Sequence, residues 1–152
     1  MKVWLKQIDR HNWREAIELL VHPSQESFVA SNMFSLAEAY ARPEGREYRP
    51  LAIYHEGRMV GFAMHVWSPE NEREHWVCRF MIGREFQGQG FGRAGMVELL
   101  ELMKSREGCQ AINLCVSPDN EAALNLYRSL GFSNTGRMLE DQCIYTLPVE
   151  RD

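Results

Sequence analysis

Gln87-Gly88-Gln89-Gly90-Phe91-Gly92 holds three glycines in five residues, between an apolar run at residues 76–82 and a helical pattern at residues 96–103. Such a loop exposes consecutive backbone N–H groups and opens a helix at the positive end of its dipole, where phosphate is favoured. Glycine costs backbone entropy on folding, so a simple turn gains nothing from three of them. The stretch therefore predicts a strand, loop and helix unit that holds a phosphorylated ligand.

Three phosphate-binding patterns overlap in this loop. Gly90-x-Gly92-x-x-Gly95 fits the dinucleotide fingerprint, but an antiparallel hairpin precedes it, and residues 114–117, about 20 positions on, contain no acid. Gly83-x-x-x-x-Gly88 imitates a P-loop, but Gln89 and Gly90 stand where Lys and Ser or Thr are required. Gln87-x-x-Gly90-x-Gly92 closes a strand and opens a helix without either conflict.

Periodicity predicts the elements around the loop. Strands are expected at residues 3–8, 51–54, 59–67, 75–82, 111–116, 133–137 and 142–147. Helices are expected after the capping box Asn12-x-x-Glu15 as far as Pro23, over residues 31–41 and 90–104, and from Asp119 or Asn120 to residue 130, before a left-handed cap at Gly131. Residues 55–58 fit a hairpin turn and residues 68–73 a polar loop. The strand from His75, the helix from Gly90 and the strand from Ala111 form one parallel unit in a mostly antiparallel sheet.

Composition narrows the class of protein. The 152 residues, 45% hydrophobic and 25% charged, fit one globular domain over 1–152. No run approaches the roughly 20 apolar residues of a membrane helix, and no signal peptide is visible, so we expect a cytoplasmic protein without a membrane partner. The net charge of −4, with no basic stripe, argues against nucleic acid and suits a small cationic substrate. Scattered histidines and cysteines without C-x-x-C spacing predict reduced thiols and no metal.

Two motifs together resemble a known superfamily. Gln87-x-x-Gly90-x-Gly92 is similar to the Arg/Gln-x-x-Gly-x-Gly/Ala pattern that binds acetyl-coenzyme A (acetyl-CoA) in the GCN5-related N-acetyltransferase (GNAT) superfamily. Asn120-x-x-Ala123-x-x-x-Tyr127-x-x-x-Gly131-Phe132 looks like its downstream helix, and the order of elements agrees over nearly the full length. The resemblance implies an α/β fold, with a mixed, mostly antiparallel sheet of about seven strands, about four helices and one parallel βαβ unit carrying the loop. It also implies acetyl-CoA as cosubstrate, no metal and, by analogy, a homodimer.

The resemblance also assigns roles within the site. Backbone N–H groups of the loop would bind pyrophosphate, and Met81 and Ile82 would pair with the pantetheine arm and polarise the thioester carbonyl. Asn120, which also fits a helix cap, would touch that arm. Tyr127 lies two helical turns later on the same face, and as general acid it would protonate the leaving sulfur; without the loop it would fit a core aromatic. The implied cofactor-binding set is Met81, Ile82, Gln87, Gly88, Gln89, Gly90, Phe91, Gly92, Arg93, Asn120 and Tyr127.

The base and the acceptor are less defined by the sequence. Related sequences often carry an acid where this chain has Cys78, which leaves Glu72, Glu74 and His75 as candidate bases. Residues 25–32, 48–54, 60–64 and 76–82 look like bacterial spermine/spermidine acetyltransferases. The predicted substrate-binding residues are Glu26, Trp67, Glu72, Glu74 and His75, although the acids near Glu70 also fit a solvated loop. Another small amine such as an aminoglycoside, a protein N-terminus, or a non-catalytic module that senses acetyl-CoA are the alternatives.

Overall fold

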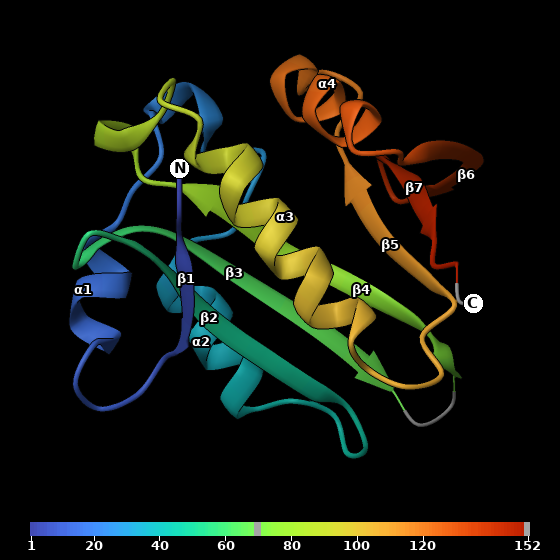
Figure 1. The fold of residues 1–152 in the computed structure, drawn as a ribbon, viewed down its shortest axis with the longest axis horizontal. Helices are drawn as coiled ribbons and strands as arrows, with labels where there is room; N and C mark the ends of the chain where they lie inside the picture. The colour runs from blue at the N-terminus through green and yellow to red at the C-terminus, as the bar shows by residue number, and fades with distance from the viewer. Residues whose placement is uncertain (69–70, 151–152) are drawn as a thin grey trace.

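A computed structural model describes residues 1–68 and 71–150, without the side chains of Ser68 and Glu72. Its centre is a seven-stranded sheet of order β1-β2-β3-β4-β5-β7-β6 (Figure 1). The strands are β1 (Trp4–Gln7), β2 (Glu47–His55), β3 (Arg58–Ser68), β4 (Asn71–Ile82), β5 (Ala111–Val116), β6 (Ser133–Leu139) and β7 (Gln142–Pro148). The pair β4 and β5 is parallel and the other pairs are antiparallel. The α/β class with one parallel unit is therefore confirmed.

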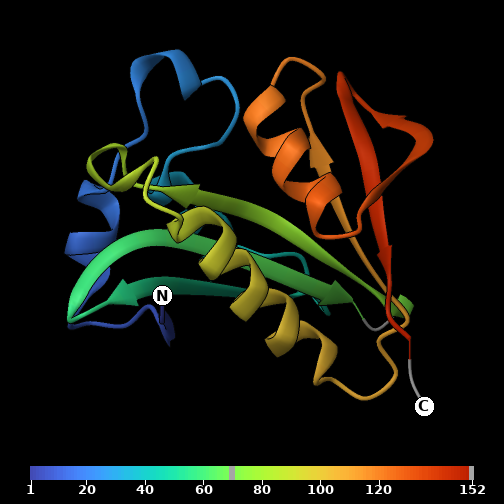
Figure 2. The same cartoon turned by 45° about the horizontal axis from the view of Figure 1, so that its top comes forward.

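Helices cover both faces of the sheet, as Figures 1 and 2 show. The α-helices are α1 (Trp13–Glu18), α2 (Asn32–Tyr40), α3 (Phe91–Lys104) and α4 (Glu121–Ser129), and the short 3₁₀ helices are η1 (Pro23–Gln25) and η2 (Arg84–Phe86). One core lies under α1 and α2, and a larger one joins α3 and α4 to the opposite face. Met96, Leu99 and Met103 of α3 are almost fully buried. Burial of each such side chain contributes about 1.5–3 kcal/mol, so α3 is firmly held at the sheet.

The first helix departs from the sequence prediction, because Asn12 does not form the predicted capping box. Its Oδ1 accepts a hydrogen bond from the Asp9 N–H at 2.8 Å, and its Nδ2 donates to the Gln7 carbonyl at 3.0 Å. The side chain thus fixes the turn after β1 instead of capping α1. The helix ends at Glu18, and Leu19 is extended, so the chain leaves it well before Pro23.

The predicted polar loop at residues 68–73 is also partly wrong. Asn71 begins β4 and pairs with Ser68 of β3. Asn71 and Arg73 are exposed, so the tip of this hairpin lacks the apolar alternation by which a half-buried strand is recognised. The start of β2 was also predicted too late. The strand begins at Glu47, whereas the apolar residues predicted it from Leu51.

The parallel pair of strands separates along its length. Glu74–Val77 of β4 pairs with Ala111–Leu114 of β5, and no later pairing joins them within the described chain. Cys78 is an extra residue in β4, between the pairs Met64–Arg79 and His65–Val77, and such a bulge bends a strand. Beyond it the arrowheads of β4 and β5 point apart in Figure 1. The sheet is therefore split at the carboxyl ends of its two parallel strands.

Candidate active site

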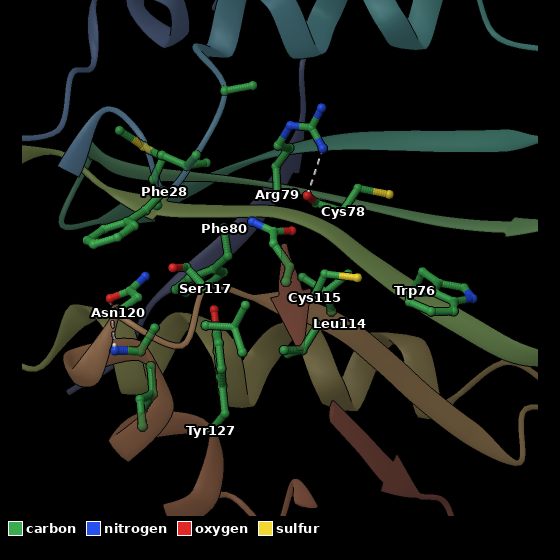
Figure 3. Close-up of a pocket in the computed structure, with 18 of the residues that line it drawn as sticks. Phe28, Trp76, Cys78, Arg79, Phe80, Leu114, Cys115, Ser117, Asn120 and Tyr127 are labelled. Atoms are coloured by element: carbon green, nitrogen blue, oxygen red, sulfur yellow. Dashed lines mark hydrogen bonds between the residues drawn. The ribbon is translucent and has the colours of Figure 1, made fainter. Parts of the chain in front are cut away.

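A cavity of about 980 Å³ occupies the split between the strands. One wall is the end of β4, with Cys78, Arg79 and Met81, and the opposite wall is the end of β5 with α4 (Figure 3). Residues 25–30, from the end of η1 to the loop before α2, and the glycine loop complete the lining. Ligands of open α/β sheets bind at this edge, where the carboxyl ends of parallel strands meet.

The glycine loop has the geometry of an anion site. Gly88 and Gly90 have φ of 76° and 92°, in the left-handed region that favours glycine. Gly90 is the N-cap of α3, and no side chain among the described residues caps the helix, so its first N–H groups have no partner within it. A Cβ at Gly92 would meet Ile82 and Leu126 at 3.9 Å, between the two walls. These N–H groups and the helix dipole suit phosphate oxygens.

The loop residues do not all face the cavity. Gln87, Gly88 and Gly92 line it, whereas Gln89, Gly90, Phe91 and the following Arg93 do not. The Gln89 amide donates to the Glu85 carbonyl at 3.3 Å, and the Arg93 guanidinium donates to the Ser129 hydroxyl at 2.8 Å. Phe91 is buried, and the centroid of its ring lies 5.0 Å from the centroid of the His55 ring. Of the three, Phe91 is the buried one, whereas Gln89 and Arg93 are exposed beside the cavity.

The end of β4 presents a free strand edge. Met81 and Ile82 pair with Phe62 and Gly61 of β3 on one side, and on the other side they line the cavity. A Cβ at Gly61 would come within 2.6 Å of the Met81 carbonyl oxygen, so glycine permits the close approach of β3 at this point. Backbone groups along such an edge can bind an extended ligand as a strand would.

Tyr127 and Asn120 enter the cavity from α4. The Tyr127 ring is buried against Phe132, with 5.8 Å between ring centroids, while its hydroxyl points into the cavity (Figure 3). Burial raises the pKa of Tyr127 to about 12, so the phenol stays protonated at neutral pH. Asn120 lines the cavity and also caps α4, because its Oδ1 accepts from the Ala123 N–H at 3.4 Å. Both roles suggested for Asn120 are compatible with this geometry.

The bulge residue Cys78 is unsuited to act as a base. It lines the cavity, and burial raises the pKa of its thiol to about 12. Arg79 holds the bulge, because its Nη1 donates to the Cys78 carbonyl at 2.9 Å. The Nη2 of Arg79 also lies 3.1 Å from Glu38 of α2, so the charge that faces the cavity here is balanced by a carboxylate.

The five predicted acceptor residues are distributed unevenly. Glu26, Trp67 and Glu74 line the cavity, and the Glu74 carboxylate accepts from the Asn71 amide at 3.1 Å. The Arg106 guanidinium lies 3.3 Å from the centre of the Trp67 ring, which also stacks with His75. His75 is 1% exposed and is not among the residues lining the cavity. The side chain of Glu72, like the whole of Glu70, lies outside the described residues.

Sequence reasoning missed several cavity residues. Cys115 and Ser117 stand at the carboxyl end of β5, a position that the rule for parallel strands could have indicated (Figure 3). Gln25 ends η1 and Phe28 lies in the loop before α2; both fall within the stretch 25–32 that resembles polyamine acetyltransferases, but only Glu26 was predicted from it. Arg79 was not predicted to line a site, because charged residues usually face solvent, whereas this one is half-buried at the bulge.

Within residues 1–68 and 71–150, no helix has the length and apolar character needed to cross a membrane. In the same part of the chain, no cluster of three or more His, Cys, Asp or Glu residues is arranged to hold a metal ion.

Comparisons with known proteins agree with this architecture. The sequence model of the acetyltransferase (GNAT) family matches residues 6–132. The spermine/spermidine N(1)-acetyltransferase of Bacillus subtilis (strain 168) is 29% identical over 143 residues, which cover 91% of this chain and 92% of that protein. The mycothiol acetyltransferase of Paenarthrobacter aurescens (strain TC1) is 33% identical over 115 residues, which cover 73% of this chain and 34% of that protein. The crystal structure of the Vibrio cholerae spermidine N-acetyltransferase in complex with CoA and spermine shares the fold, with TM-score 0.76, 18% identity and coverage of 97% of this chain and 96% of that one.

Proposed function

The chain belongs to the acetyltransferase (GNAT) family, and we propose that it moves the acetyl group of acetyl-CoA to a primary amine of a polyamine such as spermine or spermidine. The observation that carries the proposal is the position of the Tyr127 hydroxyl, inside a cavity that also contains the glycine loop and two carboxylates. The spermine/spermidine relative, similar over most of both chains, supports the choice of acceptor.

The proposed cosubstrate site uses backbone groups more than side chains. The pyrophosphate would lie on the N–H groups that open α3, around Gly88, Gly90 and Gly92. The free edge of β4 at Met81 and Ile82 would hold the pantetheine arm as a strand does, with Asn120 across the cavity. A cavity of about 980 Å³ has room for this extended molecule and an acceptor together. The chemistry supplied by acetyl-CoA is an activated thioester.

The acceptor ammonium loses two protons in the transfer and the departing sulfur gains one, so one proton is released overall. The acceptor nitrogen attacks the thioester carbonyl carbon, a carbon–nitrogen bond forms, and the carbon–sulfur bond breaks. The Tyr127 hydroxyl, which is protonated at neutral pH because burial raises its pKa to about 12, donates its proton to the departing sulfur. The second proton of the acceptor nitrogen, lost after the carbon–nitrogen bond forms, then restores the phenol. The ammonium, with an ordinary pKa near 10.4, must first lose a proton. Among the candidate bases, Glu74 lines the cavity, and we propose that it accepts this proton through water.

The acceptor end of the cavity suits a cation with an apolar stem. Glu26 and Glu74 supply carboxylates, and Trp76 and Tyr48 supply aromatic surface. Carboxylates and aromatic faces are the two groups that attract alkylammonium ions. Of the two lining arginines, Arg79 is balanced by Glu38 at 3.1 Å, so it opposes a cation less than its charge suggests.

The test is release of free thiol from acetyl-CoA in the presence of an amine panel. Spermine and spermidine should give the highest kcat/KM, and an aminoglycoside and a peptide with a free N-terminus should give lower values. A higher value for either of the latter would replace the polyamine as acceptor. Tight binding of CoA without turnover of any amine would instead make the chain an acetyl-CoA sensor.

A further inference from the structure

Two glutamine side chains form a reciprocal amide pair across the cavity wall. Gln87 Nε2 donates to Gln25 Oε1 at 2.9 Å, and Gln25 Nε2 donates to Gln87 Oε1 at 3.1 Å. Gln87 belongs to the glycine loop, whereas Gln25 ends η1, and both line the cavity. The pair therefore connects the loop proposed to hold pyrophosphate with the segment that begins the acceptor wall.

Each glutamine is itself fixed by a further hydrogen bond. Gln87 Nε2 also donates to the carbonyl of Ile82, the last residue of β4, at 2.9 Å. Gln25 Oε1 also accepts from the His22 N–H at 3.1 Å, which closes the turn of η1. One chain of hydrogen bonds thus runs from the end of β4, through the loop, into η1.

Residues 25–30 depend on this connection more than a packed element would. The backbone hydrogen bonds of this segment are local: the N–H groups of Gln25, Glu26 and Phe28 donate to the carbonyls of His22, Pro23 and Gln25. Gln25 through Ala30 all line the cavity, and none of them is buried. Val29 packs against the core under α1 and α2, but the other residues of the segment are at most half-buried. Such a segment opens at lower free energy than a packed element, so its position depends on Val29 and on the few bonds that tie it to the rest of the fold.

We propose that Gln25 is a positioning residue, which couples occupation of the glycine loop to the placement of the acceptor wall at residues 26–30. A ligand that orders the loop would orient Gln87 and, through the amide pair, hold Gln25 and the wall in place. The acceptor would then meet a formed site only after acetyl-CoA is bound. This inference rests on the proposed function, because it requires CoA to bind the loop.

Amide hydrogen exchange tests the coupling without any acceptor. CoA should slow exchange at residues 83–93 and at residues 22–31 of the wild-type chain. In Gln25→Ala, and in Gln25→Met, which preserves side-chain length, CoA should protect residues 83–93 and no longer protect residues 22–31. Ser24→Ala is the control, because Ser24 is exposed in the same η1 turn and does not line the cavity.

Kinetics supply a second readout. One neutral hydrogen bond changes an equilibrium constant by roughly 2- to 10-fold, so Gln25→Ala should raise the amine KM about 5-fold and change the Kd of CoA less than 2-fold. Protection of residues 22–31 that persists in both Gln25 variants, or that is absent in the wild type while residues 83–93 are protected, overturns the coupling. Absence of CoA binding in the wild type overturns the proposed function itself.

Discussion

The strands β4 and β5 are hydrogen-bonded to each other at one end of the pair and separated at the other. At one end, Glu74–Val77 and Ala111–Leu114 are joined by a parallel ladder. At the other, after the Cys78 bulge, the strands separate around a cavity of about 980 Å³. Buried backbone groups need hydrogen-bond partners, so the separated edges are completed by water or by a ligand. One extra residue in β4 thus separates a paired end, which stabilises the fold, from an open end, which forms the cavity.

Tyr127→Phe should give the largest effect, at the separated end. It removes the proposed acid, so kcat should fall on the order of 10²-fold or more, while the melting temperature stays close to that of the wild type because the ring still packs on Phe132. Thiol release and thermal unfolding measure the two quantities.

Tyr145→Phe is the matched control for that variant. Tyr145 is also buried, but its hydroxyl accepts from Arg128 at 3.0 Å and it does not line the cavity. Loss of the Tyr145 hydroxyl should lower the free energy of unfolding slightly and leave turnover unchanged. Equal turnover in the Tyr127 variant and the wild type would assign Tyr127 to packing.

The separated end was largely predictable because its signals are local in sequence. The alternating glycines of residues 87–92 indicate the loop, and the spacing of Asn120 and Tyr127 puts both on one face of α4. The family and the fold class that these motifs indicated are confirmed. The Cys78 bulge has no comparable signal, because it is defined by its register against β3.

Side-chain partners from distant segments were not predictable. Gln25 meets Gln87 across 62 positions of sequence, and although residues 25–32 were assigned to the acceptor side, nothing in that stretch indicates Gln87 as a partner. Trp67 was predicted to face a substrate cation, yet Arg106 lies 3.3 Å from its ring centre. The sequence indicates that Trp67 can bind a cation, whereas the fold places the Arg106 guanidinium at its ring.

The second prediction concerns stability at the paired end. Burial, and then the charges of Arg49, His75 and Arg106, lower the pKa of His65 to about 4. Between pH 6.5 and 4 the unfolded chain binds a proton that the folded chain does not, so stability is full above pH 6.5 and is lost as the pH falls. His65 is partly exposed, so we expect a loss of about 2 kcal/mol, or ~30-fold in the unfolding equilibrium.

Urea unfolding at pH 7 and pH 4.5 measures that loss. In His65→Gln, which cannot titrate, the loss over this range should be smaller by the same amount. An identical pH dependence in the variant and the wild type would show that His65 is protonated as readily in the folded protein as in the unfolded chain.

The third prediction compares two glycines of α3. Gly92→Ala has room, since its Cβ would meet Ile82 and Leu126 at 3.9 Å, but the methyl group would stand at the N–H groups proposed for pyrophosphate. We expect the Kd of CoA to rise about 10-fold with little change in melting temperature, because a ligand phosphate would lose one or two hydrogen bonds to an ionised group.

Gly95→Ala, one turn later, reverses the pattern. Its Cβ would come within 3.1 Å of the Ile53 side chain in the core, so it should lower the melting temperature and leave the Kd of CoA nearly unchanged. Calorimetric titration and thermal unfolding of both variants measure the two effects. Weaker CoA binding in Gly95→Ala than in Gly92→Ala would place the phosphates elsewhere.

The smallest effect should come from Glu26→Gln, on the exposed rim of the cavity. An exposed ion pair contributes up to about 1 kcal/mol, so the KM for spermine should rise about 3-fold while kcat is unchanged, and the difference should shrink at high salt. Glu98→Gln, which removes the same charge from the exposed side of α3 and does not line the cavity, is the control for net charge. An equal rise in KM in both variants would mean that the overall charge attracts the amine. If KM rises in neither variant, cation binding would rest on Glu74, Trp76 and Tyr48, which also line the cavity.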